Sequence, residues 1–388
     1  MQPRDLSDHV AYEAGRGIEE VARELGRDPS EFVKLASNEN PHGPSPAAVV
    51  ALREAASSVS SYPKAAHADL TAAIADRWSV TDEQIWLANG GDGALDYLHR
   101  ATIEPDDTVL VPNPGFAYYG MSARFHHGDV REYALEREDD FEQTAETVLD
   151  AYDDERIVFL TSPHNPSGST IPLADVERIA DETDEETLAV VDEAYGEFAD
   201  RDSAVALLEG DDGFDARDDV AVVRTFSKAY GLAGVRLGYA VVPDEWGDAY
   251  TRVNTPFAAS ELACRAGLAA IDDDEHVNRT VQTTENSRAY MREHIDAHVW
   301  ESEGNFALVD VGDASSVAET MQGRGVIVRD CTSFGLPGCI RITCGTDDET
   351  ERAVETLNEV LADLGLAAGD ADGDGATDTD IDAEVTDT

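Results

Sequence analysis

Positively charged residues, and lysine above all, are scarce in this 388-residue chain. It has 28 Lys and Arg against 81 Asp and Glu, a formal net charge of −53 at pH 7. Lysine occurs only at Lys34, Lys64 and Lys228. No basic cluster is available for a nucleic acid or an anionic membrane, so we expect neither as a partner. Carboxylate-rich, lysine-poor surfaces indicate a halophilic protein, because high salt screens the repulsion between like charges.

Cysteines and long apolar runs are also few. The cysteines Cys264, Cys331, Cys339 and Cys344 form no Cys-x-x-Cys pair and have no histidine at zinc-finger spacing. We therefore expect free thiols and no metal site. No stretch approaches the roughly 18 apolar residues of a membrane-spanning helix, and the N-terminus has no apolar segment typical of a signal peptide. These features predict a cytoplasmic protein.

Short apolar runs that alternate with helical patterns predict an α/β fold. They are bounded by turn residues and occur at Ile85–Ala88, Thr108–Val111, Ile157–Leu160, Leu188–Val191, Val220–Val223 and Gly238–Val242. Such runs, separated by helices, are typical of a buried, mainly parallel sheet. Ligands of these folds bind beyond the carboxyl ends of the strands, so the candidate site consists of residues that follow the runs.

The pattern changes after about residue 255, where longer helices come before three further strand candidates. The helices are expected at 260–270, 286–297 and 349–364, and the strands at 306–311, 326–329 and 339–343. We therefore expect four parts: an N-terminal arm (1–35), a large domain (36–255), a smaller C-terminal α/β domain (256–365) and an acidic tail (366–388). The tail is Gly, Asp, Ala and Thr with little to bury, which predicts disorder.

Glycines and polar residues follow the first three predicted strands of the large domain. Residues 89–93 form a glycine-rich turn before a helix, where backbone amides can approach an anion. Phe116 could cover a planar ligand. Asn165 precedes a proline, which favours an extended backbone and an outward side chain. Each feature also has a structural alternative, a helix start or core packing, and we interpret His164 as structural.

Asp192 and Lys228 carry the strongest chemical signals. Asp192 ends an apolar strand, where a carboxylate is costly unless it meets a cation or a donor, although it could also cap a helix. Lys228 remains in a chain almost devoid of lysine, and a Schiff base requires lysine because arginine does not lose its proton. Thr225, Ser227 and Arg236 can donate to a phosphate.

Taken together, these segments resemble the fold-type-I pyridoxal-phosphate aminotransferases. The stretch SKAYGLAGVRLGY at 227–239 carries a highly specific signature of that class. Within it the chain most resembles the histidinol-phosphate aminotransferases, over about residues 8–364. Supporting motifs lie at 34–45, 61–63, 191–195, 328–330 and 340–343.

The resemblance implies a fold, a cofactor and an activity. The fold would be a three-layer sandwich with a mainly parallel central sheet, plus a smaller C-terminal α/β domain. The cofactor would be pyridoxal 5′-phosphate. The reaction would be ping-pong transamination between L-histidinol phosphate and 2-oxoglutarate, giving imidazole-acetol phosphate and L-glutamate, in histidine biosynthesis. The protein would be a homodimer with shared active sites.

The resemblance also implies a role for each candidate residue. Lys228 would hold the cofactor covalently and shuttle a proton, and Asp192 would pair with the pyridinium nitrogen. The ring would be contacted by Phe116, Asn165 and Tyr195. The cofactor phosphate would be bound by Gly91, Asp92, Gly93, Thr225, Ser227 and Arg236, and by Tyr62 across the dimer. The substrate would be bound by Tyr12, Asn38, Arg329 and Arg341.

Three alternatives remain open at the level of the sequence. Two are enzymes on the same scaffold: a threonine-phosphate decarboxylase and a broad aromatic aminotransferase. The third is a non-catalytic, cofactor-binding regulator, which the acidic composition disfavours because such proteins usually carry a basic DNA-binding domain. Gly91, Gly93 and Phe116 differ from residues frequent in the family, and they leave the substrate preference open.

Overall fold

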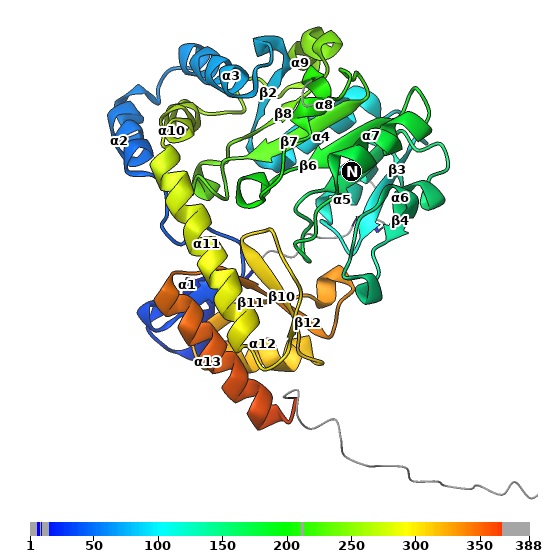
Figure 1. Cartoon of the computed structure of the whole chain (residues 1–388). Helices are drawn as coiled ribbons and strands as arrows, with labels where there is room; N and C mark the ends of the chain where they lie inside the picture. Colours follow the sequence, from blue (N-terminus) through cyan, green and yellow to red (C-terminus); the bar gives the residue numbers. More distant parts are fainter. Residues whose placement is uncertain (1–5, 8, 10–14, 211–212, 367–388) are drawn as a thin grey trace, which may run out of the picture.

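Two β-sheets organise the chain. The larger has seven strands in the order β2-β8-β7-β6-β5-β3-β4, and the smaller has five in the order β1-β11-β12-β10-β9. The structure is a computed structural model that describes residues 6–7, 9, 15–210 and 213–366. In Figure 1 the larger sheet lies in the upper half and the smaller one in the lower half, and α11 runs from one to the other.

The larger sheet is mainly parallel, as the sequence predicts. Only β8 runs antiparallel to its neighbours β2 and β7, while the remaining pairs are parallel. The strands are β2 (Ile85–Ala88), β3 (Thr108–Asn113), β4 (Asp129–Ala134), β5 (Ile157–Thr161), β6 (Leu188–Asp192), β7 (Val220–Thr225) and β8 (Gly238–Val241).

Side chains of the larger sheet alternate between two cores, which makes three layers. In β5, Val158 and Leu160 belong to one core, and Ile157 and Phe159 to the other. One face is covered by α4 (Gly90–Thr102), α5 (Tyr118–Phe125) and α9 (Gly247–Val253). The opposite face is covered by α3 (Lys64–Trp78), α6 (Ala145–Ala151), α7 (Leu173–Glu182), α8 (Val205–Glu209) and α10 (Glu261–Ile271). The predicted three-layer sandwich is confirmed.

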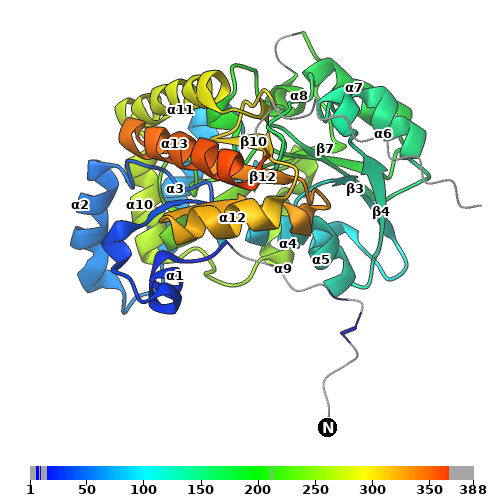
Figure 2. The same ribbon diagram turned by 90° about the horizontal axis from the view of Figure 1, so that it is seen from below.

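The smaller sheet has its own core and receives one strand from the N-terminal region. Its strands are β1 (Val33–Leu35), β9 (His298–Val299), β10 (Phe306–Asp310), β11 (Val326–Asp330) and β12 (Cys339–Thr343). Strand β1 pairs in parallel with β11, and the other pairings are antiparallel. The remaining helices are α1 (Ile18–Leu25), α2 (Pro46–Ala55), α11 (Asp274–His294), α12 (Ala314–Gly323) and α13 (Asp347–Leu364). Figure 2 shows α12 and α13 beside β10 and β12.

The differences from the predicted elements have physical reasons. Strand β4 was not expected, because its sequence DVREYA buries only Tyr133 and lies at a sheet edge, so it lacks an apolar run. Helix α11 begins at Asp274 rather than near residue 286, since Asp273 caps it through His276 N–H and its first half is polar. Residues 367–388 of the predicted disordered tail lie outside the described residues.

Two further properties concern the described residues only. No helix in these segments is long and apolar enough to cross a membrane. Within the same residues, no group of three or more His, Cys, Asp or Glu side chains is arranged to hold a metal ion. The four cysteines are buried free thiols.

Candidate active site

A cavity of about 600 Å³ opens where the larger sheet meets β11 and β12. It lies beyond the carboxyl ends of β5, β6 and β7, the place expected for a ligand in such a fold. Its walls include most of the residues predicted for the site: Asn38, Gly91, Asp92, Phe116, Asn165, Asp192, Tyr195, Thr225, Ser227, Lys228, Arg236, Arg329 and Arg341.

Of the predicted residues that the structure describes, only Gly93 and Tyr62 do not line this cavity. Tyr12 lies outside the described residues. Gly93 lies in the first turn of α4, where an added Cβ would be 3.3 Å from Ala88 Cβ. Tyr62 is 74% exposed and stacks on the ring of Phe257, with 4.4 Å between the ring centroids.

Lys228 presents a buried amine to the cavity. Its Nζ donates to the carbonyl oxygen of Ser37 at 3.2 Å and lies 5.6 Å from the ring centroid of Tyr195. Burial, and secondly the positive charge of Arg341, lower the pKa of Lys228 to about 8. At a pKa of about 8, roughly a tenth of the amine is neutral at pH 7, far more than at the ordinary pKa of 10.5, and the neutral amine is a nucleophile.

Asp192 presents a buried carboxylate at the end of β6. The Tyr119 hydroxyl donates to its Oδ2 at 2.7 Å, and the Ala194 N–H donates to its Oδ1 at 3.0 Å. Burial still raises the pKa of Asp192 to about 6, because the two donors offset the loss of water only in part. This carboxylate would be stabilised by a cationic group in the cavity.

Tyr119 is a site residue that the sequence analysis missed. It is fully buried and its hydroxyl also lies 2.9 Å from Thr161 Oγ1, at the end of β5. The sequence shows two tyrosines, Tyr118 and Tyr119, close after Phe116, and no local pattern assigns either of them to the site. Its partner Asp192 is 73 positions away, so only the tertiary structure could assign it to the site.

Donors for an anion gather at one end of the cavity. Thr225 and Ser227 lie there, and Ser227 N–H donates to Thr225 Oγ1 at 3.1 Å. The N-terminus of α4 begins at Gly90, and its first N–H groups have no partner within the helix. Arg236 reaches the same end and donates to Asp92 Oδ2 at 2.8 Å. The arrangement suits a phosphate.

Glycines allow this close approach of α4 to β8. Gly90 has φ +83°, a conformation that residues with a side chain rarely adopt. A Cβ on Gly238 would lie 2.5 Å from the carbonyl carbon of Gly90, and a Cβ on Gly90 would lie 2.6 Å from Arg236 Nη2. Because these two glycines have no side chains, Arg236 can pack against the first turn of α4 and this turn can pack against β8.

Two arginines face each other at the other end of the cavity. Arg329 on β11 and Arg341 on β12 are directly opposite in the antiparallel register. Arg329 donates to Ser333 Oγ at 2.8 Å, and Arg341 contacts Asn165 Oδ1 and donates to the Ala36 carbonyl at 3.1 Å. Like charges opposite each other are unfavourable, so this pair favours an anionic ligand between them.

A further set of side-chain hydrogen bonds fixes the part of the cavity wall that lies between these two ends. Asn38 Nδ2 donates to the Tyr195 hydroxyl at 2.9 Å, and the Thr343 hydroxyl contacts Asn38 Oδ1 at 3.1 Å. Tyr195 therefore projects into the cavity from a fixed position, and Asn165 is held by its contact with Arg341. Phe116, half-buried, supplies an aromatic wall.

The residues present fit pyridoxal phosphate. A single cavity holds a buried carboxylate for a cationic ring nitrogen, a nucleophilic amine for an aldehyde and a set of donors for a phosphate, contributed by Asp192, Lys228, Thr225, Ser227 and Arg236. The paired arginines remain for the charged group of a substrate.

Two relatives of this chain from halophilic archaea carry the same name. A protein of Natronomonas pharaonis named histidinol-phosphate aminotransferase is 68% identical over 361 residues, covering 93% of this chain and 100% of that protein. Its namesake from Halobacterium salinarum is 66% identical over 363 residues, covering 93% and 99%. Both organisms are halophilic archaea.

The solved structures agree in fold. A crystal structure of histidinol-phosphate aminotransferase from Sinorhizobium meliloti in complex with pyridoxal-5′-phosphate superposes with a TM-score of 0.78 at 28% identity, covering 90% of this chain and 95% of that chain. The family model for aminotransferase class I and II matches residues 30–357. The chain belongs to the aminotransferase class I and II family and, within it, to the histidinol-phosphate aminotransferases.

Proposed function

We propose that this protein transfers an amino group between L-histidinol phosphate and 2-oxoglutarate, giving imidazole-acetol phosphate and L-glutamate, as a step of histidine biosynthesis. The proposal is supported by relatives that are named histidinol-phosphate aminotransferase and are 54–68% identical to this chain. The observation that carries it is the buried amine of Lys228 in the same cavity as the carboxylate of Asp192, with anion-binding groups at both ends.

Pyridoxal phosphate, when bound, supplies an electron sink for negative charge at the substrate carbon that loses its proton. Lys228 would hold the cofactor through its amine and then move the proton at that carbon. The carboxylate of Asp192 would keep the ring nitrogen protonated. Asn165 and Tyr195 would donate to the ring oxygen, and Phe116 would cover the ring face.

The two ends of the cavity would bind the two phosphates. Donors at the start of α4 and after β7 would hold the cofactor phosphate: Gly91, Asp92 and Gly93 through backbone N–H groups, and Thr225, Ser227 and Arg236 through side chains. The substrate phosphate would be bound opposite, by Arg329 and Arg341 with Asn38 and Tyr12. Arg341 would also take the α-carboxylate of glutamate.

We further propose a homodimer in which Tyr62 completes the partner subunit's cofactor site. The support is that Tyr62 and Phe257, both large and exposed, stack on each other outside the chain's own cavity.

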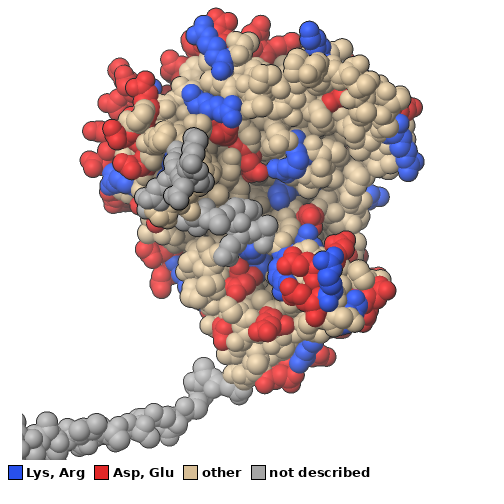
Figure 3. All heavy atoms as spheres, turned by 180° about the vertical axis from the view of Figure 1, so that it is seen from behind, with Lys and Arg blue, Asp and Glu red and all other residues tan. Residues whose placement is uncertain are grey.

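We propose a cytoplasmic location and the division into an arm (1–35), a large domain (36–255), a small domain (256–365) and an acidic tail. The acidic surface suits high salt, and Figure 3 shows acidic side chains gathered at the upper left of the face drawn and over its lower part.

Three lysine-to-arginine variants test the proposal with matched controls. Lys228→Arg keeps the positive charge but cannot attach an aldehyde, so transamination of histidinol phosphate in molar salt should be lost. Lys34→Arg and Lys64→Arg make the same chemical change outside the cavity and should stay active. Borohydride reduction of the protein with pyridoxal phosphate should add the cofactor mass to the Lys228 peptide alone. A Lys228→Arg variant that still turns over would contradict the proposal.

Substrate assays separate the two alternative enzymes. An aminotransferase needs a keto acid, whereas a threonine-phosphate decarboxylase releases CO₂ without one. Strict dependence on 2-oxoglutarate therefore supports the proposal, and turnover without it would favour the decarboxylase. Phenylalanine as a much faster donor than histidinol phosphate would instead indicate an aromatic aminotransferase.

A further inference from the structure

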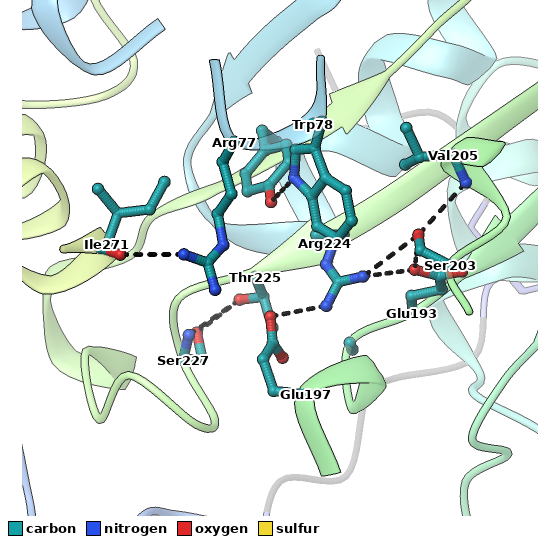
Figure 4. Close-up of polar contacts among 12 residues, drawn as sticks. Arg77, Trp78, Glu193, Glu197, Ser203, Val205, Arg224, Thr225, Ser227 and Ile271 are labelled. Atoms are coloured by element: carbon teal, nitrogen blue, oxygen red, sulfur yellow. Dashed lines mark hydrogen bonds and ion pairs between the residues drawn. The ribbon is translucent and has the colours of Figure 1, made fainter. Parts of the chain in front are cut away.

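A buried ion cluster lies next to Thr225, a residue of the cavity wall (Figure 4). It consists of Arg224, Glu193 and Glu197, whose side chains are 5%, 6% and 9% exposed. Arg224 Nη1 donates to Glu193 Oε2 at 2.5 Å, and Nη2 donates to Glu197 Oε1 at 2.7 Å. The guanidinium also lies over the Trp78 ring, 4.6 Å from its centroid. The cluster therefore holds one positive and two negative charges away from water.

The cluster is adjacent in sequence to two cavity residues. Glu193 follows Asp192 at the end of β6, and Arg224 precedes Thr225 at the end of β7. Successive residues of a strand point to opposite faces. Asp192 and Thr225 line the cavity, whereas Glu193 and Arg224 do not. Each strand end thus carries one group on the cavity side and one in the ion cluster.

The cluster connects the two strands where their backbone pairing stops. Strands β6 and β7 are neighbours, and the Glu193 N–H donates to the Val223 carbonyl at 2.8 Å. Beyond this bond the chain after β6 turns into a loop, whereas β7 continues through Arg224 to Thr225 and is paired there only with β8. The side chains of Arg224 and Glu193 form a further contact between the two strand ends. The contact of Arg224 with Glu197 also connects the end of β7 to the loop after β6.

The surroundings fix this contact in one geometry. Glu193 accepts two further hydrogen bonds, from Ser203 Oγ and from Ala204 N–H, both at 2.6 Å. Gly196 passes so close that a Cβ there would lie 2.9 Å from Arg224 Nη2. Buried ion pairs contribute little stability compared with apolar packing, which indicates a role in position rather than in stability alone. Their burial also protects them from screening in high salt.

We propose that Arg224 is a positioning residue for the cofactor. Through Glu193 and Glu197 it holds the end of β7, with Thr225, at a fixed distance from the end of β6, with Asp192. Thr225 would bind the phosphate of the cofactor, and Asp192 would bind its ring nitrogen. Because the cofactor is rigid and planar, both contacts can form only if the distance between these two residues is constant. The inference rests on the proposed function, because it assumes that the cavity binds pyridoxal phosphate.

Affinity of the cofactor-free protein for pyridoxal phosphate, measured by titration in molar salt, tests this role. Arg224→Met should weaken binding on the order of tenfold to a hundredfold, because small displacements of positioning groups have effects of that size. The pH midpoint of the bound cofactor's absorbance should move as well, since Asp192 shifts relative to the ring. Glu193→Gln keeps the shape and should show the same changes to a smaller extent.

Arg217→Met supplies the matched control. Arg217 also pairs with two carboxylates, Asp219 at 2.7 Å and Asp181 at 2.6 Å, but just before β7 begins, at the end of the strand far from the cavity. Its replacement should lower thermal stability while leaving the affinity and the absorbance midpoint unchanged.

The outcomes distinguish a failure of the proposed function from a failure of the positioning role. A wild-type protein that does not bind pyridoxal phosphate overturns the proposed function. A wild-type protein that binds, together with a folded Arg224→Met variant of equal affinity and equal absorbance midpoint, overturns only the positioning role. If Arg224→Met does not fold, Glu193→Gln decides: unchanged affinity and midpoint in that variant also overturn it.

Discussion

Replacing Asp192 with asparagine should stabilise the cofactor-free protein at neutral pH, although it removes the group proposed to pair with the cofactor. The carboxylate is buried, and its pKa is raised from 3.8 to about 6. The folded state therefore binds the proton more tightly than the unfolded state. The stability that comes from this tighter proton binding is fully present below the pKa of Asp192 in the unfolded state. It is lost as the pH rises through the pKa of Asp192 in the folded state. Asparagine carries no charge and escapes this loss.

The magnitude follows from the size of the shift. Two pKa units correspond to about 3 kcal/mol at 1.36 kcal/mol per unit. The side-chain amide of asparagine can be accommodated at this position. Its oxygen can still accept a hydrogen bond from the Ala194 N–H, and its NH₂ can donate to the Tyr119 oxygen. The Tyr119 hydroxyl can then donate to Thr161, 2.9 Å away. No partner is lost, so the electrostatic difference should dominate.

Urea unfolding of the two cofactor-free proteins in constant molar KCl measures the effect. The advantage of Asp192→Asn should grow by about 2 to 3 kcal/mol between pH 4 and pH 8, with most of the rise below pH 6. Transamination should fall in the same variant. Asp76→Asn, an exposed substitution on α3, should show no comparable rise. A difference in unfolding free energy between wild type and Asp192→Asn that does not change with pH would contradict a raised pKa of Asp192.

The remaining predictions concern the donors and the backbone around the same cavity. Tyr119→Phe removes one donor, so the pKa of Asp192 should rise further above 6 by about one unit, which moves the pH dependence of unfolding upward; an unmoved profile would contradict this. Gly238→Ala brings a Cβ to 2.5 Å from Gly90, and should cost about 1–3 kcal/mol in unfolding experiments and weaken binding of pyridoxal phosphate. The rate of cofactor attachment should rise with pH to half its maximum near 8, as the lowered pKa of Lys228 requires; a flat rate between pH 6 and 10 would exclude that pKa.

Local sequence predicted the framework of the larger sheet because its central strands are buried on both faces. A strand such as β5, with every residue buried, must be an uninterrupted apolar run, and such runs are visible without a structure. Strand β4 buries only Tyr133, so the same reasoning could not find it. Helix α11 was found only in its second half, because its first half is polar.

The candidate site was partly visible for a different reason. Lys228 could be singled out because lysine is nearly absent from the chain, so a retained lysine required a chemical explanation. Asp192 could be singled out because a carboxylate directly after an apolar run is energetically costly. The resemblance to a family then added residues such as Arg341, which no local pattern distinguishes.

The buried strands, the acidic surface and the lysine proposed as the reactive amine could thus be predicted from the sequence. Only the tertiary structure decided which side chains meet: Tyr119 with Asp192, Arg329 opposite Arg341, and Arg224 with two glutamates behind the cavity. These contacts depend on strand order and register, which bring together residues far apart in the chain. Local periodicity records whether a side chain is buried, but not which partner it finds there.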